Sequence, residues 1–263
     1  MDPLGRVIVA DEERQRVAVF DVAGHYLLAV LETFAAPTGV AVDVAGDIWV
    51  CDALAHRVGH YTPEGTPVGG WSEGMTSPYG IAVTPSGEVL VADAALGSVL
   101  RFAPDGTPLG GFGTPGSGPG QLLQPYALAV SPQGTVYVAD HGNDRVQVFS
   151  AAGEYLSEWG GPGAGRGQFA GPRGIALAPD GSVYVSDSGN HRVQKLDATG
   201  TFLSQWGSPG AGPGEFDGPA GVALAPGGEI LVADHANDRV QVFVAGATPA
   251  RVTTWGRLKA LYK

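Results

Sequence analysis

Short apolar stretches that end in an aspartate recur along the whole chain. Their aspartates are Asp11, Asp52, Asp93, Asp140, Asp187 and Asp234, in the strings VIVAD, IWVCD, VLVAD, VYVAD, VYVSD and ILVAD. Successive aspartates lie 41, 41, 47, 47 and 47 residues apart. A short apolar run of this kind, bounded by turn residues, predicts a β-strand. The regular spacing of these strands predicts a repeat protein.

Each repeat contains three more predicted strands. A second strand begins five residues after the aspartate, with Arg16, Arg57, Arg145, Arg192 and Arg239, and with Ser98 in the third repeat. A third strand ends in an aromatic residue, which is Trp71, Phe112, Trp159, Trp206 or Trp255, whereas Val30 takes this place in the first repeat. The remaining strand precedes the aspartate strand and opens with Pro37, Pro78, Pro125, Pro172 or Pro219. Four strands in about 40–47 residues are typical of one propeller blade.

Six such repeats predict an all-β fold, a six-bladed β-propeller of four-stranded antiparallel blades that occupies residues 1–263 as a single domain. A lone sheet of this kind exposes apolar side chains on both faces, and radial packing of the blades buries them. Gly5 corresponds to the turn after the innermost strand, so the first repeat lacks that strand. We expect Leu258–Tyr262 to pair beside Arg6–Ala10 and close the ring, with a frayed tail or a short helix as the alternative.

The composition changes this picture little. Glycine and proline together make 42 plus 20, or 62, of the 263 residues, about twice the usual share. Such an excess is also typical of disorder, but 44% of the residues are hydrophobic, so the chain can bury a core. On the repeats, the prolines open blades or lie in turns, and the glycines cluster in the loops between blades.

Charge and cysteine content exclude several classes of function. A formal net charge of −11 opposes binding to nucleic acid or anionic lipid, which requires clustered Lys and Arg. The single cysteine cannot form an internal disulfide or a thiolate metal cluster. No apolar run approaches the ~18 residues of a membrane-spanning helix, so no membrane insertion is expected. Met1–Gly5 does not resemble a signal peptide, but a removed signal would leave the same sequence, so the compartment stays open.

The last three repeats resemble a known family. The strings VYVADHGNDRVQVF, VYVSDSGNHRVQKL and ILVADHANDRVQVF, with WGGPGAGRGQF upstream of PRGIAL, are similar to the NHL repeats of six-bladed propellers. The resemblance extends over residues 5 to 256 and is weaker in the first three repeats. It implies the fold but not one function, because the family includes scaffolds, sensor domains, RNA-binding modules and lyases.

Two branches of that family fit the sequence poorly. In the peptide-amidating lyases the zinc histidines follow the blade-opening proline, whereas this chain has Thr38, Tyr79, Tyr126, Arg173 and Ala220 there. The RNA-binding members use a strongly basic loop face, which this acidic chain cannot easily supply. The resemblance therefore argues against both lyase activity and RNA binding.

Residues that every repeat shares are interpreted as structural. An aspartate at a strand end can accept backbone N–H bonds, and an arginine at a fixed offset can brace the loop. The repeated aromatic residues are interpreted as packing between blades. Gly111–Gly116 matches G-x-G-x-x-G, but Ser117–Gly120 cannot open the helix that a dinucleotide site needs, so this stretch is interpreted as an inter-blade loop.

Candidate functional residues are those at which the repeats differ. Besides the residue after the proline, the residue after the aspartate varies: Glu12, Ala53, Ala94, His141, Ser188 and His235. We expect both positions to lie in loops at one end of the ring. Tyr79, Tyr126 and Arg173 would then form an aromatic wall with a cationic clamp, able to stack a planar group or hold a carboxylate. The alternative is that these are variable loop residues without function.

The leading hypothesis is a binding scaffold for a protein, a peptide or a small ligand at the mouth of the channel. Its expected ligand-binding residues are Tyr79, Tyr126, Arg173, Thr38, Glu12 and Ser188. The alternative is a lyase, hydrolase or cyclase with catalytic candidates His141, His235, Arg173 and Tyr126. No cofactor is expected. Zinc or calcium is the alternative, held by His141, His235 and Glu12, while the opposing interpretation takes these as ordinary polar turn residues.

Overall fold

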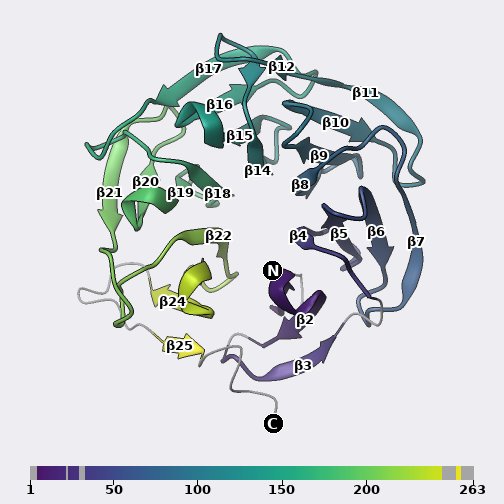
Figure 1. Ribbon diagram of the computed structural model, residues 1–263, viewed down its shortest axis with the longest axis horizontal. Helices are drawn as coiled ribbons and strands as arrows, with labels where there is room; N and C mark the ends of the chain where they lie inside the picture. The colour runs from purple at the N-terminus through teal and green to yellow at the C-terminus, as the bar shows by residue number, and fades with distance from the viewer. Residues whose placement is uncertain (1–4, 22, 30–32, 245–252, 256–263) are drawn as a thin grey trace. The chain divides into compact units, whose positions relative to one another are not determined.

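The computed structural model describes residues 5–21, 23–29, 33–244 and 253–255. Contacts divide the chain into two compact units, one of Met1–Val138 with Val148–Ser157 and one of Ala139–Gln147 with Glu158–Lys263. The described part contains six antiparallel sheets, five of four strands and one of three, and a short two-stranded parallel pair. The fold is therefore an all-β, six-bladed β-propeller, as the repeats predict (Figure 1).

The first three sheets belong to the first unit. Its sheets are β1 (Val7–Asp11), β2 (Arg16–Phe20) and β3 (Tyr26–Ala29); β4 (Pro37–Val42), β5 (Ile48–Asp52), β6 (Arg57–Tyr61) and β7 (Pro67–Trp71); and β8 (Pro78–Val83), β9 (Val89–Asp93), β10 (Ser98–Phe102) and β11 (Pro108–Phe112). The parallel pair β12 (Thr114–Pro115) and β13 (Gln121–Leu122) follows. A 3-10 helix, η1 (Glu12–Arg14), joins β1 to β2.

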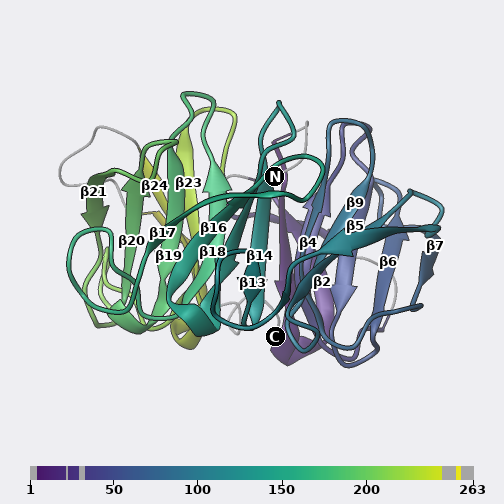
Figure 2. The ribbon, with the colours of Figure 1, turned by 90° about the horizontal axis from the view of Figure 1, so that it is seen from above.

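The fourth sheet contributes residues to both units, and the last two sheets belong to the second. The fourth consists of β14 (Pro125–Val130), β15 (Val136–Asp140), β16 (Arg145–Phe149) and β17 (Tyr155–Gly160). The others are β18 (Pro172–Leu177), β19 (Val183–Asp187), β20 (Arg192–Leu196) and β21 (Phe202–Trp206); and β22 (Pro219–Leu224), β23 (Glu229–Asp234), β24 (Arg239–Val244) and β25 (Thr253–Trp255) (Figure 2). The helices η2 (His141–Asn143), η3 (Ser188–Asn190) and η4 (His235–Asn237) each follow an aspartate strand.

Apolar clusters lie between consecutive sheets of each unit. One joins the second and third sheets through Trp49, Val58, Ile81 and Phe102, and another joins the fifth and sixth through Tyr184, Val193, Val232 and Phe243. The repeated aromatic residue bridges the same sheets, because the ring centroid of Trp206 lies 5.6 Å from that of Phe243. Radial packing, and the packing role of the aromatic residue, are thus confirmed within the units.

The inner strands of neighbouring sheets approach each other at the backbone. β4 contacts β8, and β18 contacts β22. A Cβ atom on Gly80, in β8, would lie 2.7 Å from the backbone oxygen of Tyr126, in β14. Glycine at this position therefore permits the close approach that a narrow propeller centre requires.

The predicted closing strand, Leu258–Tyr262 beside Arg6–Ala10, falls largely outside the described residues and stays a prediction. Within them, β1 pairs with β2 only, which agrees with a first repeat that lacks its innermost strand. Across the described residues, no helix is long and apolar enough to cross a membrane.

Candidate functional site

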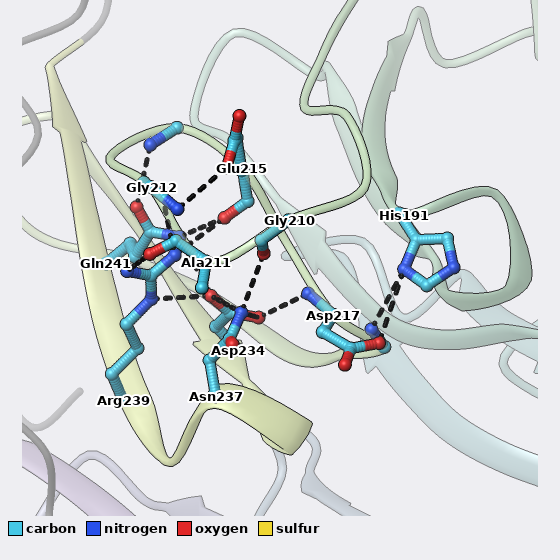
Figure 3. A network of polar contacts seen from close by, with 12 residues as sticks. His191, Gly210, Ala211, Gly212, Glu215, Asp217, Asp234, Asn237, Arg239 and Gln241 are labelled. Carbon is cyan, nitrogen blue, oxygen red and sulfur yellow. Dashed lines mark hydrogen bonds and ion pairs between the residues drawn. The ribbon is translucent and has the colours of Figure 1, made fainter.

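The repeated aspartates are buried acceptors at the end of a strand. Asp234 accepts hydrogen bonds from Arg239 Nε at 2.6 Å, from Gln241 Nε2 at 3.0 Å and from the backbone N–H of Asp217 at 2.7 Å (Figure 3). Asn237 donates to the same carboxylate from within η4. The arrangement fixes the turn after the strand to the loop that precedes the inner strand of the same sheet.

The repeated arginines hold the glycine-rich loops. The guanidinium of Arg239 donates to the carbonyl oxygens of Ala211, Gly212 and Glu215 at 2.6, 2.8 and 2.8 Å (Figure 3). Arg192 donates in the same way to Ala164, Gly165 and Gln168. The structural interpretation of the shared Asp and Arg residues is confirmed by these contacts.

The G-x-G-x-x-G match is a loop closed on itself. The side-chain oxygen of Gln121 accepts the backbone N–H of Gly118 at 2.9 Å, and β12 pairs with β13 on either side. Gly165 and Gly212 make the same bond to Gln168 and Glu215. No helix follows these glycines in the described chain, so the backbone offers no helix N-terminus for a pyrophosphate.

The residue before each repeated arginine adopts a left-handed backbone conformation, and Asp144 and His191 also contact the loop before the next sheet. Asp144 (φ 53°) accepts the backbone N–H of Gly171 at 2.7 Å, and His191 Nδ1 (φ 51°) accepts that of Gly218 at 3.3 Å. Asp217 Oδ1 lies 3.6 Å from the same His191 nitrogen (Figure 3). These residues link consecutive sheets of the second unit.

In the first unit, the structure brings two predicted ligand-binding residues together. The rings of Tyr79 and Tyr126 stack with their centroids 4.4 Å apart and their planes 11° from parallel. Thr38, on the preceding inner strand, donates from Oγ1 to the carbonyl oxygen of Pro78 at 3.0 Å. Because the two rings are in contact, a planar ligand cannot insert between them, and the pair presents itself as one aromatic surface.

In the second unit, three other candidates line one open depression. His141 at the start of η2, Arg173 in β18 and Ser188 at the start of η3 lie together around a volume of about 400 Å³. The rest of its lining comes from Asp144, Ala170, Gly171, Gly189 and His191. In these two repeats, the residues after the aspartate (His141 and Ser188) and the residue after the proline (Arg173) therefore line the same depression.

His141 is held against the backbone at the edge of the depression. Burial lowers the pKa of His141, and the neighbouring positive charge of Arg173 lowers it further, whereas Asp144 acts in the opposite direction. A Cβ atom on Gly171 (φ 59°) would lie 2.7 Å from His141 Cε1, so glycine makes room for the imidazole. At neutral pH the imidazole is therefore neutral and able to accept a proton.

The remaining candidates lie elsewhere. His235 and Glu12 are exposed residues at the start of η4 and η1. No three His, Cys, Asp or Glu side chains gather closely enough to hold a metal ion anywhere in residues 5–21, 23–29, 33–244 and 253–255. The zinc or calcium alternative at His141, His235 and Glu12 gains no support from this arrangement and stays a prediction.

Two ionisable residues of the depression, Asp144 and His191, were not among the predicted site residues. Asp144 and His191 immediately precede repeated arginines, and because this position differs between the repeats (Gln15, His56, Gly97, Asp144, His191 and Asp238), the same variation could have identified them. Gly171 stands directly before a blade-opening proline, as Gly218 does, where the other repeats have Ala36, Ser77 or Gln124, so the sequence does not single it out. The contact between Gly171 and the imidazole of His141 becomes visible only when the two sheets are placed next to each other.

Comparison with known proteins identifies the repeat and the fold. The NHL repeat family matches residues 34–61, 122–149, 169–196 and 216–243. No curated protein sequence matches this chain. Each of the four matched segments contains an aspartate strand, the turn after it and the strand that begins at the repeated arginine.

Several solved structures are similar in fold. A structure described as streptogramin B lyase has a TM-score of 0.71 at 16% identity, over 96% of this chain and 80% of that chain. A nidogen/laminin complex contains a chain with a TM-score of 0.76 at 16% identity, over 95% of this chain and 92% of that one. Hydrazine synthase of Kuenenia stuttgartiensis contains one with a TM-score of 0.67 at 15% identity, over 92% and 93%. At these identities the likeness shows the fold alone.

Proposed function

Because the chain belongs to the NHL-repeat family, we propose that it is a binding module whose loop-end depression captures a ligand, a peptide or a segment of a protein. The single observation that carries this proposal is the meeting of His141, Arg173 and Ser188 around one open depression. All three occupy positions at which the repeats differ. The residues that the repeats share are engaged in holding the sheets together.

The framework around the depression suits recognition. Arg173 projects from an inner strand, and the loop that carries His141 is tied to Gly171 through Asp144. Side chains on a rigid scaffold lose little conformational entropy when a ligand binds. A guanidinium, an imidazole and a hydroxyl group offer both charge and directional hydrogen bonds to a polar partner.

The partner is proposed to be a protein, a peptide or a small molecule rather than a nucleic acid. The chain carries 26 acidic against 15 basic side chains. Binding to a phosphate backbone gains most of its affinity from neutralisation by Lys and Arg, which this balance opposes. A chain of a nidogen/laminin complex has a similar fold, which supports a propeller of this type as a module that takes part in protein complexes.

The proposal is tested with variants at matched positions. A panel of peptides and polar metabolites is screened by thermal shift, and the best binder is measured by calorimetry. We expect Arg173→Ala and His141→Ala each to weaken that binder about tenfold or more. His235→Ala is the matched control, because His235 occupies the same repeat position but is exposed and outside the depression. Equal binding by all variants that remain folded would overturn the proposal.

An enzyme is the second candidate, and one observation favours it. The lowered pKa of His141 keeps its imidazole neutral beside the cationic Arg173. A neutral imidazole next to a cation is suited to act as a general base beside an anion-binding group. The enzyme alternative from the sequence, a lyase, hydrolase or cyclase, names this pair together with Tyr126 and His235 as catalytic candidates. Turnover of the bound compound by wild-type protein but not by His141→Ala would support it, and metal analysis of the purified protein would test the metal-dependent form.

A further inference from the structure

The depression in the second unit combines positive charge with few competing acids. Its lining contains one guanidinium, from Arg173, and two imidazoles, from His141 and His191. Asp144 is the one carboxylate of that lining, and its Oδ1 accepts the backbone N–H of Gly171 at 2.7 Å. Asp217 lies at the His191 side, 3.6 Å from Nδ1. Arg173 is thus the fixed cation of this lining, and it lies beside the imidazole of His141, whereas the Asp144 carboxylate is engaged by the Gly171 backbone.

Arg173 and His141 act on each other electrostatically. Burial and the charge of Arg173 both disfavour the protonated imidazole. An anion next to the guanidinium would offset that charge and add its own attraction to a proton on the ring. Protonated, His141 would become a second cationic donor to the same anion, so proton binding and anion binding would strengthen each other.

We propose that the group recognised in this depression is a carboxylate, bound between Arg173 and His141, and that its binding is accompanied by uptake of one proton by His141. This rests on the proposed binding function and names the chemistry of the ligand at that site. A carboxylate matches the planar fork of a guanidinium in a bidentate manner. The imidazole of His141 and the hydroxyl group of Ser188 line the same depression and would donate to the remaining lone pairs of the carboxylate.

The groups that face His141 set the direction of the pH dependence. They are Arg173 from β18, Asp144 from its own loop, and His191 with the adjacent Asp217 from the following repeat. With the carboxylate bound, the pKa of His141 lies higher than in the free protein. Affinity therefore rises as the pH falls from above the bound-state pKa to below the free-state pKa, and it is constant outside that window.

The test uses acetate as the probe and the imidazole NMR signals of the intact chain. Each histidine is titrated in sodium chloride and in sodium acetate of equal ionic strength, with acetamide as the uncharged isostere. We expect acetate to raise the pKa of His141, while acetate and chloride should give the same imidazole spectra for the exposed His235, which lies outside the depression. A shift of one pKa unit corresponds to a tenfold gain in acetate affinity at low pH. Arg173→Gln should abolish the shift, with its fold checked by the dispersion of the same spectra.

The possible results separate the carboxylate hypothesis from the binding function. If acetate binds in an Arg173-dependent manner without moving the pKa of His141, proton uptake is wrong. If phosphate shifts His141 more than acetate does, or acetate causes no shift, the carboxylate assignment is wrong, although the binder found in the panel could still require Arg173. If that binder is also indifferent to Arg173→Gln, both the assignment and the proposed function fall.

Discussion

Nε of Arg192 donates a hydrogen bond to Oδ2 of Asp187 across 2.7 Å, and both side chains are almost fully buried. The same guanidinium also reaches three loop carbonyl oxygens and the side chain of Gln205. One buried ion pair thus connects two strands of the fifth sheet to the loop that precedes it.

Removal of Arg192 should be costly. Arg192→Met leaves the buried Asp187 carboxylate without its cation and the carbonyl oxygens of Ala164, Gly165 and Gln168 without a donor. Breaking a buried pair in this way typically costs about 3–5 kcal/mol. The control is Arg57→Met, because Arg57 Nε lies 3.9 Å from Asp52 and its side chain is 29% exposed, so we expect a loss under about 1 kcal/mol. Urea denaturation midpoints compare the two, and equal losses would contradict the assigned role.

The third repeat shows how the arginine can be dispensed with. Asp93 faces Ser98 instead of arginine, and it accepts backbone N–H groups of Thr76, Ser77, Ala95 and Leu96 at 2.7–3.2 Å. Backbone N–H groups of the two adjoining loops therefore supply the donors to the Asp93 carboxylate in this repeat. The aspartate is thus the common element of the six repeats, and the arginine adds the link to the glycine-rich loop.

Because the inner strands approach each other closely, a side chain added at Gly80 should lower the stability of the fold. In Gly80→Ala the new methyl group would lie 2.7 Å from the backbone oxygen of Tyr126 and 2.8 Å from Cα of Ala127. Neither backbone atom can move without shifting a strand, so we expect a loss of about 1–3 kcal/mol. Gly69→Ala, in the exposed strand β7, meets nothing within 4 Å and should leave the unfolding midpoint nearly unchanged. A neutral Gly80→Ala would contradict the observed packing of β8 against β14.

Cys51 should be unreactive in the folded protein. It is fully buried, and both burial and the nearby Asp93 and Asp52 carboxylates raise its pKa well above the usual value. Thiol reagents react with the thiolate, so the folded chain should release colour from Ellman's reagent far more slowly than the chain unfolded in urea. Rapid reaction of the native protein would mean that β5 opens locally.

The architecture could be predicted from the sequence because the same types of residue mark the strand ends in each repeat. The aspartate at a strand end, the arginine five residues later and the proline before the inner strand recur in register, and each has a local physical role. The candidate site could be predicted only in part. His141, Arg173 and Ser188 occupy positions singled out because the repeats differ there, whereas Asp144 and His191 stand directly before the repeated arginines, at a position that also varies but was not singled out. Their placement depends on contacts between sheets, which sequence spacing does not report.

The tyrosine pair illustrates the same limit. The sequence places Tyr79 and Tyr126 at one repeat position on consecutive inner strands, but it does not say that the rings touch. Because their centroids are 4.4 Å apart, a double-mutant cycle of Tyr79→Ala and Tyr126→Ala should give a coupling energy of about 0.5–1.5 kcal/mol. Urea unfolding of the two single variants and the double variant measures it. Strict additivity would show that the stack contributes nothing beyond the burial of each ring.

Stability near the depression should depend on pH through His141. Its folded-state pKa lies below the ordinary value of 6.5, so the unfolded chain binds the proton more readily. The contribution is therefore fully present above pH 6.5 and is lost as the pH falls through the window between that value and the lower folded-state pKa. We expect the wild-type urea midpoint to drop more between neutral and mildly acidic pH than that of His141→Gln, which has no ring to protonate. His235→Gln, with an exposed side chain, should keep the wild-type pH profile. If His141→Gln retains the full acid sensitivity, the imidazole is not held neutral in the folded protein.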